Sequence, residues 1–104
     1  NTATIRESLL EKAFELGEKF ITASKEHYDP GIIGPFCLQT CIDKDMNYAI
    51  YDVAPRVGGG TNVHVSVGHP YGNATWRKPV SSGRRIAMEI RRAVEQDRLL
   101  EVLT

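Results

Sequence analysis

Residues 36–55, FCLQTCI-DKDMN-YAIYDVAP, decide the fold of this chain. Residues 36–42 and 48–55 are rich in apolar and β-favouring side chains, and the polar residues 43–47 between them are typical of a turn. The pattern predicts an antiparallel hairpin with residues 44–47 as its loop, so that Asp43 faces Tyr48. One mostly apolar face then pairs Ile42 with Ala49, Thr40 with Tyr51, Leu38 with Val53 and Phe36 with Pro55. The opposite face pairs Cys41 with Ile50, Gln39 with Asp52 and Cys37 with Ala54.

Helical patterns flank this hairpin. Apolar residues recur on one side of a helical wheel from Arg6 to about Glu26, which predicts an amphipathic helix. Thr4 is its expected N-cap, because Glu7 three residues later would complete a capping box. A closing helix is expected over residues 83–97, capped by one of the serines at 81 and 82.

The segment between the hairpin and the closing helix is harder to interpret. Alternating valines predict a third strand over residues 61–67, and residues 68–80 read as a long loop. The expected fold class is therefore α+β, with an antiparallel sheet of three strands and helices covering one of its faces.

The composition limits the classes of function. The chain has 104 residues with 13 basic and 13 acidic side chains, so its formal net charge is zero, which argues against binding to nucleic acid. No apolar run is long enough to span a membrane, and no signal peptide is recognisable. The chain lacks an initiator Met, and we expect a fragment of a longer protein. Cys37 and Cys41 would lie about 13 Å apart in one strand, which suggests reduced thiols in a cytoplasmic protein.

Gln39 and Asp52 are the sharpest candidate pair. The expected register places their oxygen-bearing side chains opposite each other on one face of the hairpin. Such ligands suit Mg²⁺, which accepts one or two protein carboxylates together with substrate phosphates. The alternative is a polar cross-strand pair on a solvated face, and the pattern alone favours that alternative.

Basic residues offer candidate anion sites. Arg56 precedes a triple glycine and could reach a phosphate, although that glycine run lacks the ending of a P-loop. Arg84 and Arg85 fall in the first turn of the closing helix, where the helix dipole favours negative charge, so an anion would relieve their repulsion. Salt bridges to acidic residues are the alternative. The histidines show no zinc spacing, and nothing favours a cysteine nucleophile.

Four motifs in order resemble a known family. They are IRESLL at 5–10, IGPFCLQ at 33–39, DVAPRVGGGTN at 52–62 and GRRIA at 83–87. Together they resemble the C-terminal part of the archaeal formate-dependent 5-formaminoimidazole-4-carboxamide ribonucleotide (FAICAR) synthetases, which are ATP-grasp enzymes of purine biosynthesis. The resemblance covers nearly the whole chain.

The resemblance implies an ATP-dependent carbon–nitrogen ligase. ATP activates formate as formyl phosphate, the amine of aminoimidazole carboxamide ribonucleotide attacks it, and Mg²⁺ or Mn²⁺ neutralises charge on the phosphates. It implies Gln39 and Asp52 as metal ligands and Arg56 as the catalytic residue. Asn1 matches a family Asn that contacts the nucleotide substrate, and Asn62 lies in the motif that faces the phosphates. Arg84 and Arg85, which the helix dipole already indicated, complete the expected substrate-binding residues.

The family usually has Glu where Asp52 stands, and this chain lacks the ATP-grasp segment that supplies phosphate-binding lysines and the adenine pocket. We therefore expect no turnover by the chain alone, and a homo-oligomer for the complete protein. The alternative function is a non-catalytic ATP-grasp-like paralogue or assembly module. A third reading is an α+β domain whose motifs are only structural.

Overall fold

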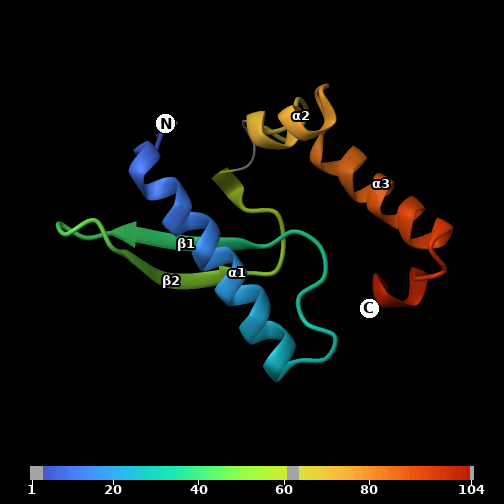
Figure 1. Cartoon of the computed structure of the whole chain (residues 1–104), viewed down its shortest axis with the longest axis horizontal. Helices are drawn as coiled ribbons and strands as arrows, with labels where there is room; N and C mark the ends of the chain where they lie inside the picture. Colours follow the sequence, from blue (N-terminus) through green and yellow to red (C-terminus); the bar gives the residue numbers. More distant parts are fainter. Residues whose placement is uncertain (1–3, 61–63, 104) are drawn as a thin grey trace. The chain divides into compact units, whose positions relative to one another are not determined.

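The computed structural model describes residues 4–60 and 64–103 and confirms the α+β class. Its helices and strands are shown in Figure 1. In chain order they are the 3-10 turn Glu7–Leu9, α1 (Leu10–His27), β1 (Cys37–Ile42), β2 (Tyr48–Ala54), α2 (Pro70–Trp76), α3 (Ser82–Glu95) and the 3-10 turn Leu99–Glu101. The chain divides into two compact units, Asn1–Arg56 and Val57–Thr104, which are described separately.

The first unit consists of α1 and the hairpin of β1 and β2. In Figure 1 the helix crosses the hairpin, and specific bonds hold it there. The Tyr48 hydroxyl donates to the Leu9 carbonyl at 3.1 Å, and the rings of Phe20 and Phe36 lie 4.9 Å apart between centroids. The half-buried residues of α1 recur with helical spacing, as the amphipathic pattern predicted. They are Leu10, Ala13, Leu16, Gly17, Phe20, Ile21 and Ser24.

The start of α1 differs from the prediction. A 3-10 turn precedes the α-helix, and in it the Leu9 amide donates to the Arg6 carbonyl at 2.9 Å. Leu9, rather than Thr4, is the N-cap residue of α1, and it makes no side-chain capping bond. The expected capping box was wrong because Arg6 is extended and the 3-10 turn begins at Glu7, so Glu7 is the first residue of the turn and not the third residue after a cap at Thr4.

The predicted hairpin register is confirmed in the half away from the turn and wrong in the half next to the turn. Cys37, Leu38 and Gln39 pair with Ala54, Val53 and Asp52, as predicted. Nearer the turn the ladder shifts by one residue, so the predicted partners were wrong there. Thr40 pairs with Ile50, Cys41 with Ala49 and Ile42 with Tyr48. The shift leaves Tyr51 as the extra residue of a β-bulge.

Two predictions for the second unit were wrong. Residues 64–67, the described part of the expected third strand, form a turn in which the Gly68 amide donates to the His64 carbonyl at 2.8 Å. The described sheet accordingly has two strands. Within the expected long loop the structure has the helix α2, with Pro70 in its first turn and the His69 ring accepting from the Tyr71 amide. A proline in the first turn of a helix loses no internal hydrogen bond.

The Asn73 side chain links the residues before α2 to the residues after it. The Asn73 amide nitrogen donates to the Val67 carbonyl, and its oxygen accepts from the Val80 amide, each at 3.0 Å. Gly68 lies inside this closure with a φ of +78°, and a Cβ there would overlap the Val80 carbonyl oxygen and Asn73 Oδ1. Only glycine adopts this conformation and leaves room for both atoms.

The closing helix agrees with the prediction. α3 begins after Ser81, whose hydroxyl oxygen accepts from the Arg84 amide at 3.2 Å. Its Ala93 is buried, whereas Ile86, Ile90 and Val94 are 42%, 42% and 56% exposed and form an apolar stripe along the helix.

The described residues include few that are buried. The buried apolar side chains are those of Leu9, Ala54, Val80 and Ala93. None of the described helices combines the length and the apolar character needed to cross a membrane.

Candidate metal centre

The Gln39 and Asp52 side chains meet on one face of the hairpin. They are direct cross-strand partners, and Gln39 Nε2 donates a hydrogen bond to Asp52 Oδ2 at 2.5 Å. Gln39 is half-buried and Asp52 is exposed, so the carboxylate is accessible from solvent. The predicted juxtaposition of an amide and a carboxylate is therefore confirmed.

The bulge at Tyr51 brings Asp52 opposite Gln39. At the turn, the Asp43 amide donates to the Asn47 carbonyl at 3.0 Å, and Ile42 pairs with Tyr48. A regular ladder counted back from that turn would place Tyr51 opposite Gln39. Asp52 would then lie on the other face, because neighbouring strand residues point to opposite sides. One extra residue in β2 restores the pairing that the site needs.

The turn itself is held by the Asp43 carboxylate. Its Oδ1 accepts from the Asn47 amide at 2.8 Å and from the Asp45 amide at 2.9 Å, while Met46 takes a left-handed φ of 62°. The hydrogen bond from the Asn47 backbone is the main reason why the pKa of Asp43 lies below its ordinary value. This Asx-type turn shortens the loop by one residue relative to the prediction, which explains the shifted register.

The donor set fits a hard divalent cation. A carboxylate and an amide oxygen are ligands of the kind that Mg²⁺ uses when substrate phosphates and waters complete its shell. Cys37 and Cys41 flank Gln39 on the same strand, yet within residues 4–60 and 64–103 no three His, Cys, Asp or Glu side chains group as a metal cage. The pair therefore suits an open site shared with substrate oxygens better than a closed zinc site.

The remaining predicted residues lie elsewhere. Arg56 follows β2 by two residues, and its amide donates to the Ala54 carbonyl at 2.8 Å. Asn1 and Asn62 lie outside the described residues. Arg84 and Arg85 occupy the first turn of α3, in the second unit.

Arg85 has partners within its own unit. Its guanidinium lies 2.6 Å from Glu89 Oε1 and 5.2 Å from the centroid of the Trp76 ring. The i,i+4 spacing of Arg85 and Glu89 is visible in the sequence, whereas the cation–π contact with Trp76 depends on how α2 and α3 meet. The anion-binding role of Arg84 and Arg85 stays a prediction.

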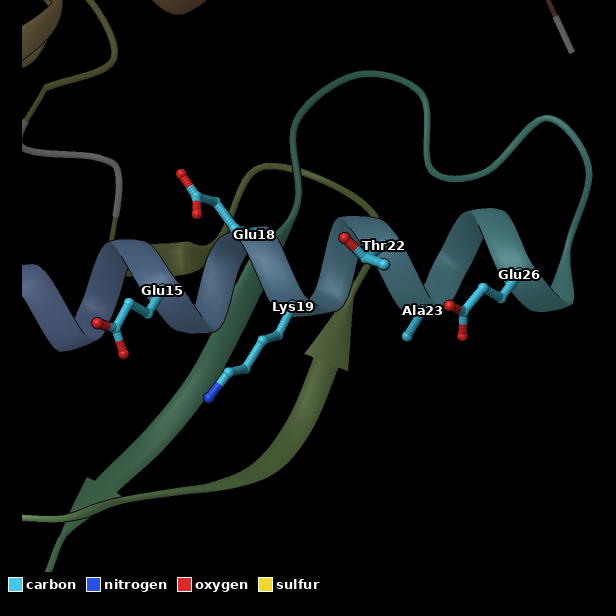
Figure 2. A pocket seen from close by; sticks show the side chains of 6 residues that line it. All are labelled: Glu15, Glu18, Lys19, Thr22, Ala23 and Glu26. Carbon is cyan, nitrogen blue, oxygen red and sulfur yellow. The ribbon is translucent and has the colours of Figure 1, made fainter.

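A hollow on the surface of α1 offers no comparable chemistry. Figure 2 shows its lining side chains, which all come from this one helix: Glu15, Glu18, Lys19, Thr22, Ala23 and Glu26. The exposed carboxylates are spread along the helix, and no second element supplies a converging polar group. This hollow is therefore not a candidate site.

The fold and the site define a class: an α+β chain whose hairpin carries an exposed amide–carboxylate pair suited to a hard cation. The chain belongs to the family described as "Domain of unknown function (DUF1297)", whose model matches residues 1–104.

Two named relatives are similar in sequence to this chain. The chain is 40% identical over 102 residues to the 5-formaminoimidazole-4-carboxamide-1-(beta)-D-ribofuranosyl 5'-monophosphate synthetase of Methanobrevibacter smithii, covering 98% of the chain and 28% of that relative. It is 43% identical over 102 residues to the protein of the same name from Saccharolobus solfataricus, covering 98% of the chain and 30% of that relative. These comparisons confirm the family that the four motifs indicated, and the chain spans less than a third of these relatives.

A solved structure supports the same relationship. The IMP biosynthesis protein PurP from Thermococcus kodakaraensis is similar to this chain with a TM-score of 0.80 and 39% identity. The similarity covers 98% of this chain and 33% of that protein. The fold described above is therefore shared with a solved member of the same group.

Proposed function

We propose that this chain is the metal- and nucleotide-binding part of an ATP-dependent ligase that formylates aminoimidazole carboxamide ribonucleotide with formate in purine biosynthesis. The names of the relatives support the pathway and the product. The Gln39–Asp52 pair is the observation that carries the proposal, because it presents oxygen ligands on one face of a hairpin held in register. The proposal concerns the complete protein, of which this chain supplies one part.

Each residue of the pair has a distinct proposed task. The exposed Asp52 carboxylate would hold the cation together with phosphate oxygens of the substrate. Gln39 contributes an amide oxygen from the neighbouring strand. Mg²⁺ or Mn²⁺, when bound, supplies charge neutralisation at the phosphates during phosphoryl transfer to formate. Asp52 is one methylene shorter than glutamate, so its carboxylate lies closer to the strand than a glutamate carboxylate would.

We propose that Arg56 stabilises negative charge on the transferred phosphoryl group. It lies four residues beyond Asp52 along the chain, and a guanidinium stays charged at every physiological pH. Arg84 is the better anion ligand of the pair in α3, because Arg85 is engaged by Glu89 and Trp76. Asn1 and Asn62 are proposed contacts to the nucleotide substrate.

Phosphate release by the complete protein tests this function. We expect release from ATP only when formate and aminoimidazole carboxamide ribonucleotide are both present, together with Mg²⁺ or Mn²⁺. Phosphate release that does not depend on formate or on the ribonucleotide contradicts the proposal, and so does the absence of any release. Product identity, measured by the ultraviolet spectrum and mass of the formamido nucleotide, separates formylation from simple ATP hydrolysis.

The exposed apolar stripe on α3 favours the second candidate, an assembly module. Ile86, Ile90 and Val94 form a row that a second copy of the chain could cover in a homo-oligomer. A complete protein that forms oligomers and shows no ligase activity would favour this candidate. Replacing Ile90 with Glu would then reduce the oligomer mass in sedimentation, whereas the control Arg92→Glu, at an exposed position of the same helix, would leave it unchanged.

A further inference from the structure

The two tyrosines of β2 have different surroundings. Tyr48 is half-buried, and its hydroxyl donates to the Leu9 carbonyl at 3.1 Å, so this ring is held against α1. Tyr51 is 68% exposed, more than any other large apolar or aromatic side chain of β1 and β2. Within residues 4–60 and 64–103, the Tyr51 side chain makes no hydrogen bond and no contact with another aromatic ring. No specific contact among the described residues therefore holds this ring.

The position of Tyr51 places its ring beside the proposed metal ligand. Tyr51 is the extra residue of the β-bulge, and Asp52 follows it directly. A bulge redirects side chains, because strict alternation between the two faces is interrupted there. The contacts of Tyr48 and Phe36 identify the face of the hairpin that α1 covers. An exposure of 68% shows that the Tyr51 ring lies outside this covered contact.

The proposed reaction requires a heteroaromatic ring close to the cation. The amine of aminoimidazole carboxamide ribonucleotide must come within about 3–3.5 Å of the activated formyl carbon. That carbon is joined through one oxygen to the phosphoryl group that shares the cation with Asp52. The aminoimidazole ring carries the amine directly, so it is close to Asp52 when the amine attacks. The adenine of ATP is separated from the terminal phosphate by the ribose and two further phosphates, and it lies farther away.

We propose that Tyr51 positions the ribonucleotide substrate by stacking its ring against the aminoimidazole ring. This inference rests on the proposed function and adds the residue that recognises the amine substrate. Stacking needs only the face of the ring, so an exposed tyrosine without other partners suits this task. Tyr51 is a positioning residue: it orients the aminoimidazole ring so that the amine points toward the formyl carbon.

Equilibrium binding of the ribonucleotide separates stacking from other roles. Tyr51→Ala in the complete protein should weaken this binding about tenfold, measured by isothermal titration calorimetry with ADP and Mg²⁺ present. Tyr51→Leu keeps apolar bulk but has no aromatic face, so it should weaken binding to a similar extent. Tyr51→Phe should restore most of the affinity. Tyr28→Ala is the matched control, because Tyr28 follows α1 and is 77% exposed, and this variant should bind like the unaltered protein.

The kinetics of phosphate release test which substrate the ring contacts. In Tyr51→Ala, the KM for the ribonucleotide should rise about tenfold, while the KM for ATP should change by less than about twofold. A rise in the KM for ATP alone would assign the ring to adenine and overturn the inference. Mn²⁺ binding with ADP, measured by electron paramagnetic resonance, should be unchanged in Tyr51→Ala. A weaker binding of Mn²⁺ would indicate that Tyr51 maintains the bulge and would also overturn the inference.

The outcomes distinguish this inference from the proposed function. An unchanged ribonucleotide affinity in Tyr51→Ala and Tyr51→Leu, in a protein that forms the formamido nucleotide, would overturn the stacking role and leave the proposed function intact. An unaltered complete protein that neither binds the ribonucleotide nor releases phosphate would overturn both.

Discussion

The two units of this chain use charged and polar side chains differently. In the first unit, side chains connect elements that are distant in sequence. Tyr48 reaches Leu9 and Lys12 reaches the Met46 carbonyl, at 3.1 Å and 3.3 Å. In the second unit the ion pairs are local to α3 and the turn that follows it, at spacings of three or four residues: Arg85–Glu89, Arg91–Glu95 and Arg98–Glu101. The metal ligands that we propose need the first arrangement, because they come from two strands that must be held in one register.

The largest expected effect concerns activity in the first unit. Asp52→Asn in the complete protein should lower phosphate release by about 100-fold or more, because a neutral amide binds the cation far less well than a carboxylate. Asp45→Asn, an exposed acid of the same hairpin, is the matched control and should keep full activity. Unchanged activity of Asp52→Asn would remove Asp52 from the metal site, and Asp52→Glu should be tolerated.

The second unit contains a glycine, Gly68, that should not tolerate a side chain. Gly68→Ala should lower the free energy of unfolding by about 2–3 kcal/mol, since the methyl group would overlap the Val80 carbonyl oxygen and Asn73 Oδ1. Gly72→Ala is the control, because a Cβ at Gly72, within α2, has no atom within 4 Å. It should be neutral or stabilise the helix by about 0.5–1 kcal/mol. Urea unfolding measures both variants, and equal effects would contradict the described closure.

A smaller effect tests the contact between α1 and the hairpin. Tyr48→Phe removes the hydroxyl that donates to the Leu9 carbonyl and should lower the free energy of unfolding by about 1 kcal/mol. Tyr51→Phe, at the bulge, is the control, since Tyr51 is 68% exposed. Equal stability of the two variants in urea unfolding would indicate that α1 is not held by this bond.

The smallest effect is a pH dependence. Folding lowers the pKa of Asp43. The ionised carboxylate therefore stabilises the hairpin when the pH is above the pKa that Asp43 has in the unfolded chain, and this stabilisation is lost as the pH falls through its pKa in the folded chain. Asn in its place could still accept both turn amides but would not titrate in this range. The protection of the amides of residues 45 and 47, measured as their exchange rate relative to the intrinsic rate at each pH, should therefore fall below pH 4, about the ordinary Asp pKa, and Asp43→Asn should flatten that profile. An identical profile in the variant would contradict this role.

The difference between the units also explains which parts of the fold could be predicted. Helical periodicity over many residues identified α1 and α3, and Ser81 was one of the two expected caps. The helix α2 was missed because it is short and combines proline, glycine and asparagine, which usually signal a loop. The valines at 65 and 67 suggested a strand, but the described residues 64–67 form a turn.

The pairing of Gln39 with Asp52 was predicted, but the turn and the bulge next to it were not. The prediction placed Gln39 opposite Asp52 by assuming residues 44–47 as the loop. The real loop is one residue shorter and the bulge at Tyr51 compensates for it, so this pairing was right although the turn was wrong. The bulge was not foreseen, because the hydrogen bonds of Asp43 set the turn length and the alternation does not reveal them.

By itself, the sequence determined the α+β class, the long helices and the hairpin, because each follows from periodicity within neighbouring residues. Only the tertiary structure decided that Tyr51 is the extra residue, that the Gln39 nitrogen faces Asp52, and that Arg85 is engaged by Trp76 and Glu89. These features depend on which atoms meet across separate elements, and a linear pattern does not contain those distances.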